Sequence, residues 1–348
     1  MYQIKELSNG IKVLLENMEN LNSVSLGVYY KTGSVDEMDN EQGVAHLLEH
    51  MVFKGTKTRS AKDISEEIDL IGGHINAYTS KEITAFYTVT LAEYVEKSIE
   101  ILADILNNST FTEENLEKEK KVVIEEIRMY QDMPEDLVHD INSEEIVSGA
   151  LGRNILGTEE SVNSISRETL VNYFQKRYTT NNMVISIVGA IDFDSIIELL
   201  EKYFVTEREN IEVARENVDF TIKPSHNIIR KDINQVHLCF NTKGLSYLDK
   251  NKYVLSVISN ILGGNMSSRL FQKIREERGL CYSVYTYVSS YKNGGLFTVY
   301  VGTTKEDYKE VLEMIKEEFE DIKNNGVSLI ELQKAKNQLL SSMIIGLE

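Results

Sequence analysis

The sequence predicts an α+β protein built from two similar domains, each a mostly antiparallel β-sheet packed with helices. Its 348 residues exceed a typical single domain and fit two. Both halves show the same order of elements: strands, two helices, a pair of strands and long helices. The stretch between them is charged and irregular and contains Pro224, which is typical of a linker. We therefore predict domains at 1–207 and 226–348, joined by a linker at 208–225.

Composition narrows the class of protein and its partners. A hydrophobic share of 42% with 26% charged residues is ordinary for a soluble globular protein. The net charge of −18 disfavours nucleic acid and anionic membrane surfaces and suits basic or neutral partners. With only two cysteines, a disulfide framework is not expected, and a reducing compartment is favoured. Because the start lacks a signal-peptide pattern and no long apolar run occurs, we predict a cytoplasmic protein without a membrane partner.

The first half begins with strands. Asn9 and Gly10 form a turn signal between two apolar stretches, which indicates a β-hairpin. A later helix is expected to start after Ser60, paired with Asp63 as in a capping box, and to stop at Gly72. Periodicity and β-propensity predict strands at 2–7, 11–15, 24–30, 74–79, 83–91 and 183–189, with further helices at 41–53, 93–106, 113–131, 140–147, 168–177 and 194–203.

The second half repeats this order of elements. Strands are predicted at 228–233, 236–242, 282–289 and 296–301, and helices at 251–262, 267–278, 305–323 and 329–345. The last residues continue a helical pattern without a C-cap, and this half is shorter than the first. We therefore expect the second domain to be truncated, with at least a helix missing.

The helix predicted at 41–53 carries His46, Glu49 and His50. Residues three and four apart share one face of a helix, so these three side chains point the same way. Two neutral imidazoles suit zinc, and a carboxylate between them that does not bind the metal can take a proton from metal-bound water. The order His-x-x-Glu-His is the inverzincin motif, the inverse of His-Glu-x-x-His. The motif predicts a zinc centre with Glu49 as the base.

The helix predicted at 113–131 places Glu126 and Glu119 inside an apolar arc that includes Val122, Leu116 and Ile127. Carboxylates on a buried face are costly unless they are paired or bound to a metal. Glu126 and Glu119 therefore need a partner. The alternative is a charge-rich, solvated helix whose acidic residues interact with neighbouring lysines.

Several blocks of this chain resemble the pitrilysin and insulysin-like zinc peptidases, family M16, which include the mitochondrial processing peptidase. The match is closest to the short bacterial members and covers essentially the whole chain. The blocks that carry the resemblance are 43–50, the strand pair after Gly73, 122–128 and 263–283. The resemblance implies two related domains that face each other across a cleft. The helix at 253–260 takes the place of the motif helix but has no His or Glu, so only the first domain is expected to bind metal.

The resemblance also assigns roles to individual residues. It implies that Glu126 is the third ligand of one Zn²⁺ per chain, beside His46 and His50. It makes Glu119 a carboxylate that orients a ligand without binding the ion, and Glu82 a weaker candidate for the same role.

Substrate residues follow from the same resemblance. Arg275 and Tyr282, in the second half, are implied to reach across the cleft to the substrate. Asn76 and Ala77 are implied to lie on the strand edge to which a peptide adds as a further strand. The active unit is expected to be a homodimer or a pair with a related chain.

These observations predict a zinc metalloendopeptidase, a processing-peptidase-like enzyme acting on peptides or unfolded segments. One alternative is a non-catalytic scaffold or regulatory subunit of a peptidase pair, although such subunits typically have broken motifs. Another is a lyase of the S-ribosylhomocysteine type, which uses the same His-x-x-Glu-His helix but a Cys as third ligand. Cys239 and Cys281 both lie in the second half, and a Glu stands at the peptidase spacing.

Overall fold

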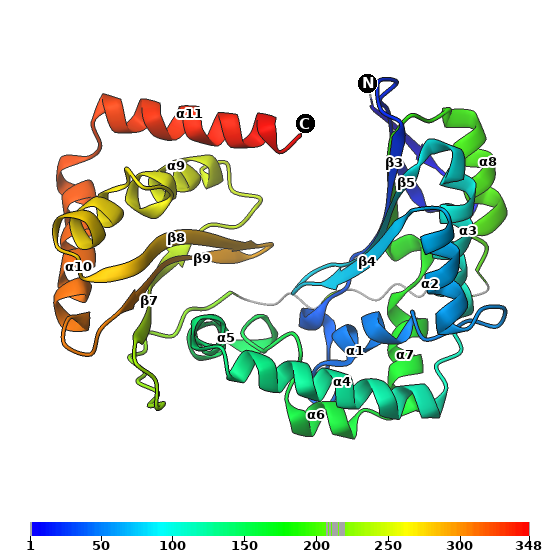
Figure 1. Cartoon of the computed structure of the whole chain (residues 1–348), viewed down its shortest axis with the longest axis horizontal. Helices are drawn as coiled ribbons and strands as arrows, with labels where there is room; N and C mark the ends of the chain where they lie inside the picture. Colours follow the sequence, from blue (N-terminus) through cyan, green and yellow to red (C-terminus); the bar gives the residue numbers. More distant parts are fainter. Residues whose placement is uncertain (1, 207, 209, 211–214, 216–219, 348) are drawn as a thin grey trace. The chain divides into compact units, whose positions relative to one another are not determined.

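The computed structural model describes residues 2–206, 208, 210, 215 and 220–347, which form two compact units (Figure 1). The first unit groups Met1–Met129 with Gly149–Asn217, and the second groups Tyr130–Ser148 with Val218–Glu348. Each unit combines a largely antiparallel sheet with helices, as the sequence predicts. None of the described helices is both long and apolar enough to cross a membrane.

The boundary between the units differs from the predicted domains. Residues 130–148, expected in the first domain, belong to the second unit because helix α5 (Pro134–Ile146) packs on strand β7 (Val236–Gly244). Asn142 on α5 and Asn241 on β7 exchange two side-chain hydrogen bonds, at 3.1 and 2.6 Å. The predicted linker at 208–225 lies partly outside the described residues.

The first unit is built on a six-stranded sheet with the order β1-β2-β6-β3-β5-β4. The pairing of β2 with β6 is parallel, and the other pairings are antiparallel. The hairpin predicted around Gly10 is confirmed as β1 and β2. The strands are β1 (Tyr2–Glu6), β2 (Lys12–Asn17), β3 (Ser23–Tyr30), β4 (His74–Thr79), β5 (Thr84–Leu91) and β6 (Met183–Gly189).

Helices pack on one face of this sheet because its strands alternate buried and exposed residues. The motif helix α1 packs between β4 and α7, and α3 packs on β3 and β5. The helices of the first unit are η1 (Ser34–Asp36), α1 (Val44–Met51), α2 (Ala61–Leu70), η2 (Ala92–Tyr94), α3 (Val95–Asn108), α4 (Glu113–Gln131, which ends just inside the second unit), η3 (Gly149–Leu151), α6 (Glu159–Ser164), α7 (Arg167–Arg177), η4 (Thr180–Asn182) and α8 (Phe193–Tyr203). The capping box predicted at Ser60 is confirmed at the start of α2.

The second unit contains a three-stranded antiparallel sheet with the order β7-β9-β8. Apolar residues of one sheet face pack against α9, η5 and α10. The opposite face carries polar and aromatic side chains such as Tyr285 and Tyr287, which hydrogen-bond to His139 on α5. The remaining elements are α9 (Lys252–Gly263), η5 (Phe271–Glu277), β8 (Cys281–Tyr291), β9 (Gly294–Thr303), α10 (Tyr308–Asn325) and α11 (Leu329–Ile345).

One predicted strand is wrong. Residues 228–233 contain no strand, although the sequence there is rich in isoleucine. Ile228 and Ile229 are largely exposed, and β7 pairs with β9 in the described sheet and not with this segment. β-propensity alone does not form a strand where no neighbouring strand pairs with the segment.

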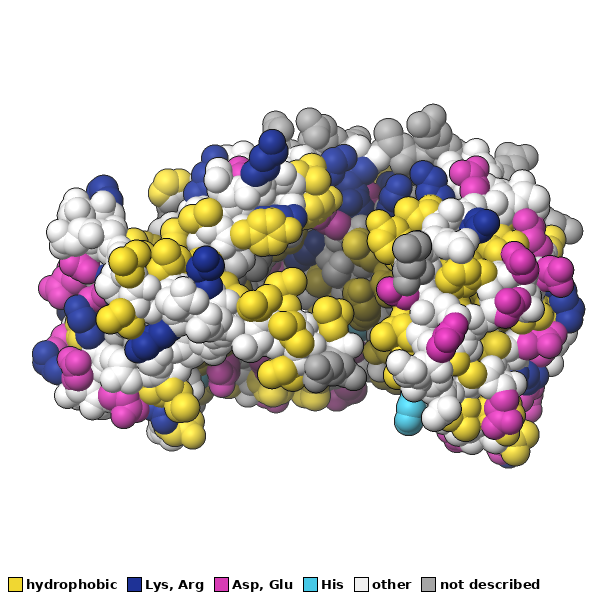
Figure 2. Space-filling model, turned by 90° about the horizontal axis from the view of Figure 1, so that it is seen from above, with side chains coloured by type: hydrophobic (Ala, Val, Ile, Leu, Met, Phe, Trp, Pro, Cys, Tyr) yellow, Lys and Arg dark blue, Asp and Glu magenta, His cyan; other side chains and the backbone are white. Residues whose placement is uncertain are grey.

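On the face drawn in Figure 2, exposed hydrophobic side chains intermix with charged ones.

Candidate active site

The start of α1 is fixed by a glycine and a buried carboxylate. Gly43 has φ of 88°, and a Cβ there would lie 2.6 Å from the Leu156 carbonyl oxygen. This left-handed conformation starts the helix at Val44, later than the predicted residue 41. The Glu37 carboxylate accepts hydrogen bonds from the backbone N–H groups of Gly43 (3.0 Å) and Ala45 (2.9 Å). Burial raises the pKa of Glu37 to about 8, against the effect of these bonds. These contacts anchor the N-terminal end of the motif helix.

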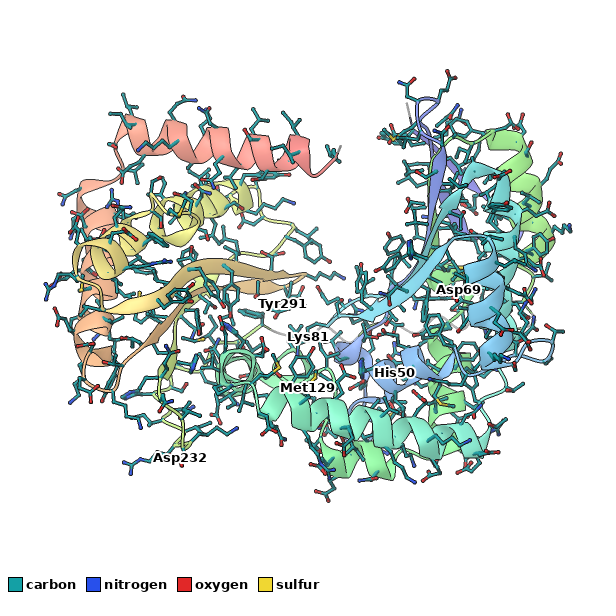
Figure 3. All side chains as sticks on the ribbon, viewed as in Figure 1. His50, Asp69, Lys81, Met129, Asp232 and Tyr291 are labelled. Carbon is teal, nitrogen blue, oxygen red and sulfur yellow. The ribbon has the colours of Figure 1, made fainter. Side chains whose placement is uncertain are left out.

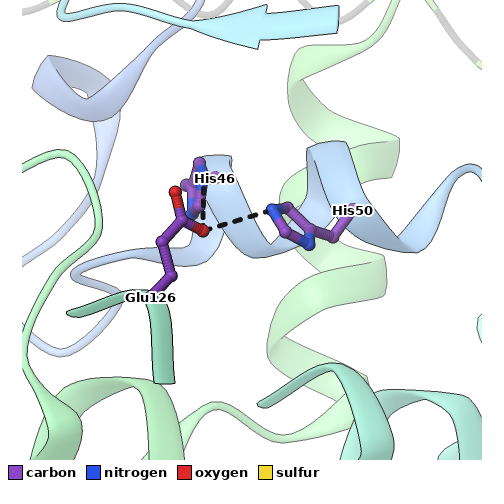
Figure 4. A group of neighbouring side chains, drawn as sticks. All are labelled: His46, His50 and Glu126. Atoms are coloured by element: carbon purple, nitrogen blue, oxygen red, sulfur yellow. Dashed lines mark ion pairs between the residues drawn. The ribbon is translucent and has the colours of Figure 1, made fainter. Parts of the chain in front are cut away.

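His46, His50 and Glu126 converge, as Figure 4 shows. Glu126 Oε2 lies 3.8 Å from His46 Nε2 and 3.7 Å from His50 Nε2. Tetrahedral zinc with bonds of about 2.0–2.2 Å keeps its ligand atoms roughly 3.4 Å apart. The two Glu126 distances are close to that value, and one ligand atom from each of the three residues lies within 4.8 Å of the others. Among the described residues, this is the only group of three or more His, Cys, Asp or Glu side chains close enough to hold a metal. The donor set therefore fits zinc.

The protonation of His46 suits a metal ligand. Burial, together with the neighbouring His50, lowers the pKa of His46 to about 3. The imidazole is therefore neutral near pH 7, which is the form that binds metal ions.

Glu126 lies at the margin of the buried face of α4, although the sequence pattern places it inside the apolar arc. Val122, expected inside the apolar arc, is 50% exposed, and Met129 on the same helix is 52% exposed. The buried side of the helix instead runs through residues such as Val123 and Ile127. Glu126 is therefore half-buried, next to the histidines and open to solvent on its other side. Its neighbour Glu125 is exposed and pairs with Arg128.

Glu49 lies between the two histidines on α1 and contacts strand β4. The hydroxyl of Thr79, the last residue of β4, donates a 2.5 Å hydrogen bond to Glu49 Oε2. Burial raises the pKa of Glu49, and the Thr79 hydrogen bond partly opposes that rise. Thr79 is a site residue that the sequence analysis missed. Its position at the end of the proposed substrate strand could have indicated that it lies near the site.

Glu119 contacts His50 from the side opposite Glu126. Its Oε2 is 3.3 Å from His50 Nδ1, and its Oε1 is 2.9 Å from Lys54 Nζ. Figure 3 shows His50 on α1 beside α4, the helix that carries Glu119. Burial opposes ionisation of Glu119, but the hydrogen bonds from His50 and Lys54 outweigh it and lower its pKa. The carboxylate is therefore ionised and oriented toward a metal-ligand candidate, the place that the resemblance implies for it.

Glu82 lies in the turn between β4 and β5. Its carboxylate is 3.5 Å from Arg215 Nη1, and its backbone oxygen accepts a 2.7 Å hydrogen bond from Arg215 Nη2. The structure thus places Glu82 beside a cation that the sequence analysis did not consider. The role in orienting a metal ligand stays a prediction for Glu82.

Asn76 and Ala77 lie on β4, which ends the six-stranded sheet. The Asn76 side chain is exposed, whereas Ala77 packs against the core of the first unit. Asn76 Oδ1 accepts a 2.8 Å hydrogen bond from the Ala77 backbone N–H. The edge strand predicted for substrate is thus present, and one of its backbone donors is bonded to its own neighbour.

Arg275 and Tyr282 belong to the second unit, whereas the metal-ligand candidates belong to the first unit. The Arg275 guanidinium lies over two aromatic rings, 4.6 Å from the centroid of Phe271 and 5.0 Å from that of Tyr282. Tyr282 is 75% exposed. The two residues therefore form an adjacent, accessible pair, and their reach to a substrate stays a prediction.

Comparison with known proteins points to one family. Residues 12–159 match the family model described as insulinase, peptidase family M16, and residues 164–339 match the one described as the peptidase M16 inactive domain. A Bacillus subtilis relative, named an uncharacterised zinc protease, YmxG, is 42% identical over 98% of this chain and 83% of its own length. A Streptomyces coelicolor relative, also named an uncharacterised zinc protease, is 33% identical over 98% of this chain and 76% of its own length.

Solved structures show the same fold. A structure titled as a peptidase M16 inactive domain from Pseudomonas fluorescens superposes with a TM-score of 0.91 at 22% identity, over 98% of this chain and 84% of that one. A protease from Helicobacter pylori gives the same TM-score and identity, over 99% and 85%. At this identity, the likeness concerns the fold.

Proposed function

Because this chain belongs to peptidase family M16, we propose that it is a zinc metalloendopeptidase that hydrolyses peptides or unfolded protein segments. The observation that carries the proposal is the convergence of His46, His50 and Glu126 on one point. Glu49, between the two histidines, is not one of the converging ligands and can serve as a base. The names of the relatives, which call them zinc proteases, support the same reading.

The reaction follows from the positions of these side chains. Zinc, when bound by His46 Nε2, His50 Nε2 and Glu126 Oε2, would supply a Lewis acid and lower the pKa of a bound water. Thr79 holds Oε2 of Glu49, which leaves Oε1 to accept the proton of the attacking water. Glu49 then returns that proton to the leaving amine. Peptide hydrolysis by this route needs no covalent intermediate on the protein.

We place the substrate along β4 as an added strand. The edge position of β4 leaves backbone groups for such pairing, in which main-chain bonds supply affinity and sequence preference is loose. The hydrogen bond between the Ala77 N–H and Asn76 Oδ1 would open, so that both groups could bond to the peptide. Because Thr79 ends the same strand, a peptide bound there runs toward Glu49.

Two residues of the second unit are proposed to contact the substrate. Arg275 and Tyr282 would donate hydrogen bonds to the bound peptide or to its developing oxyanion. The net charge of −18 supports a preference for basic peptides. The active unit would be a homodimer or a pair with a related chain, which the mass of the active species in solution would decide.

The test measures metal content and peptide cleavage in the wild type and in Glu49→Gln. We expect about one zinc per chain in both proteins, cleavage of a peptide library by the wild type only, and loss of that cleavage with a chelator. Removal of a general base typically lowers turnover by about 10²–10⁴-fold. Glu66→Gln, at an exposed position on α2, is the matched control.

Two results would contradict the proposal. Turnover retained by Glu49→Gln would refute Glu49 as the base. Absence of stoichiometric metal from the wild type would favour the non-catalytic scaffold instead.

A further inference from the structure

Lys54 shares the Glu119 carboxylate with His50. Lys54 follows the end of α1, four residues after His50, and its Nζ lies 2.9 Å from Glu119 Oε1. The other carboxylate oxygen, Oε2, lies 3.3 Å from His50 Nδ1. Each oxygen of Glu119 therefore has its own partner, and both partners come from the same short stretch of chain.

The surroundings of Glu119 make the second partner necessary. The residue is only 5% exposed, so water cannot replace a lost hydrogen-bond partner. Without the Lys54 ammonium, one oxygen of a buried carboxylate would be left without its cation, and the side chain would turn to find another donor. A turn of that kind would carry Oε2 away from His50.

The orientation of Glu119 matters because of what lies on the other side of the His50 ring. A carboxylate acceptor at Nδ1 holds the proton on that nitrogen and leaves Nε2 free for a metal. His50 Nε2 is the atom that faces Glu126 Oε2 at 3.7 Å. The tautomer and ring plane of His50 therefore depend on where Glu119 points.

We infer that Lys54 is a positioning residue for the metal centre: its ammonium holds Glu119 in the orientation that fixes His50 as a ligand. This inference rests on the proposed function, since it concerns affinity for the proposed zinc ion. The sequence alone shows only that Lys54 is a cation that follows the predicted motif helix.

The backbone at Lys54 is anchored independently of its side chain. Asn115, on the helix that carries Glu119, donates a 2.8 Å hydrogen bond from Nδ2 to the Lys54 carbonyl oxygen. Lys54 N also donates to the Met51 carbonyl oxygen at 3.1 Å. Replacing the Lys54 side chain should therefore leave the path of the chain unchanged, and a mutation there tests the ammonium itself.

The experiment measures zinc affinity of the full chain by competition with a chromophoric chelator. The variants are Lys54→Met, Lys54→Arg, Glu119→Gln and the double Lys54→Met/Glu119→Gln, with exposed Lys57→Met as control. Groups that orient metal ligands typically contribute about 10–100-fold in affinity, so we expect Lys54→Met to lose about tenfold. Lys54→Arg should keep most of the affinity, and Lys57→Met should keep all of it.

The double variant separates positioning from a general effect. If Lys54 acts through Glu119, the double variant binds zinc no more weakly than Glu119→Gln alone; independent effects would multiply. The visible spectrum of the Co²⁺-loaded protein gives a second readout, because it should change in Lys54→Met and not in Lys57→Met. Urea midpoints of the metal-free variants check that each one folds.

The outcomes distinguish this inference from the proposed function. Wild-type protein that binds no zinc overturns both. Wild-type protein that binds zinc, with Lys54→Met binding it equally well or with multiplying losses in the double variant, overturns the inference alone.

Discussion

The hydroxyl of Thr79 donates a 2.5 Å hydrogen bond to Oε2 of Glu49, and this contact joins strand β4 to the motif helix α1. The strand is the proposed site of peptide addition, and the helix carries the proposed base. A single hydrogen bond thus links the residue that would move the proton to the strand that would hold the substrate.

Thr79→Val should lower kcat of peptide cleavage by about 10–100-fold without loss of zinc. The variant removes the donor that holds Oε2, and a hydrogen bond to a charged group contributes about 1.5–3 kcal/mol. Thr79→Ser keeps the hydroxyl and should restore most of the rate. Steady-state kinetics with metal analysis checks this. Equal rates for the Val and Ser variants would mean that the hydroxyl does not position Glu49.

Glu126→Gln should weaken zinc binding far more than Glu125→Gln. Glu126 Oε2 lies within 3.8 Å of both histidines, whereas Glu125 is exposed and pairs with Arg128. Because the two residues are adjacent on one helix, the neighbour is a matched control for charge and helix propensity. Isothermal titration with zinc measures both affinities. The reverse order would move the third ligand by one residue.

Gly43→Ala should destabilise the protein more than Gly10→Ala. Both glycines have positive φ, of 88° and 86°, so each substitution carries a backbone penalty of about 1–2 kcal/mol. Only at Gly43 does the added Cβ meet another atom, the Leu156 carbonyl oxygen at 2.6 Å; at Gly10 nothing lies within 4 Å. Urea unfolding of the metal-free proteins gives the difference, which isolates the clash. Equal losses would show that the start of α1 yields without strain.

His139 should make the protein less stable as the pH falls. Burial lowers its pKa below the ordinary value of about 6.5, although Glu135, Asp136 and Asp140 oppose the shift. Because the unfolded state binds the proton more readily, the stability due to neutral His139 is full above about pH 6.5. It is lost as the pH falls toward the lower pKa of the folded state.

The test compares urea midpoints of metal-free wild type and His139→Gln at about pH 7.5 and pH 5.5. The midpoint of the variant should fall less on acidification than that of the wild type. His226→Gln, at an exposed position, is the control and should follow the wild type. A variant that loses as much midpoint as the wild type would exclude His139 as the titrating group.

Arg275→Gln and Tyr282→Phe should lower peptide cleavage while leaving zinc content unchanged. Both residues are proposed to touch the substrate, and neither belongs to the unit that holds the metal-ligand candidates. Arg278→Gln is the matched control, since Arg278 is exposed and pairs with Glu310. The test measures kcat/KM of the wild type, the two variants and the control at equal zinc content. Unchanged kcat/KM in both variants would remove the pair from the proposed mechanism.

Features that depend on neighbours along the chain could be predicted. His46, Glu49 and His50 share a face because a helix repeats every 3.6 residues, and the capping box at Ser60 is a contact between residues three apart. Apart from the strand predicted at 228–233, the order of the predicted strands and helices followed from local patterns in the same way. The resemblance identifies Glu126 as a metal-ligand candidate. Its place at the margin of the buried face could not be predicted, because helix periodicity does not tell which side of a helix a neighbouring element covers.

Contacts between residues that are distant in the sequence were decided by the tertiary structure alone. Thr79 meets Glu49 across 30 residues of sequence, and Glu119 meets His50 across 69. The grouping of 130–148 with the second unit depends on His139 and Asn142 reaching strands about a hundred residues away or more. Periodicity tells which way a side chain faces within its own element. Only the packing of elements, set by burial and by pairing of polar groups, determines which side chain lies opposite it.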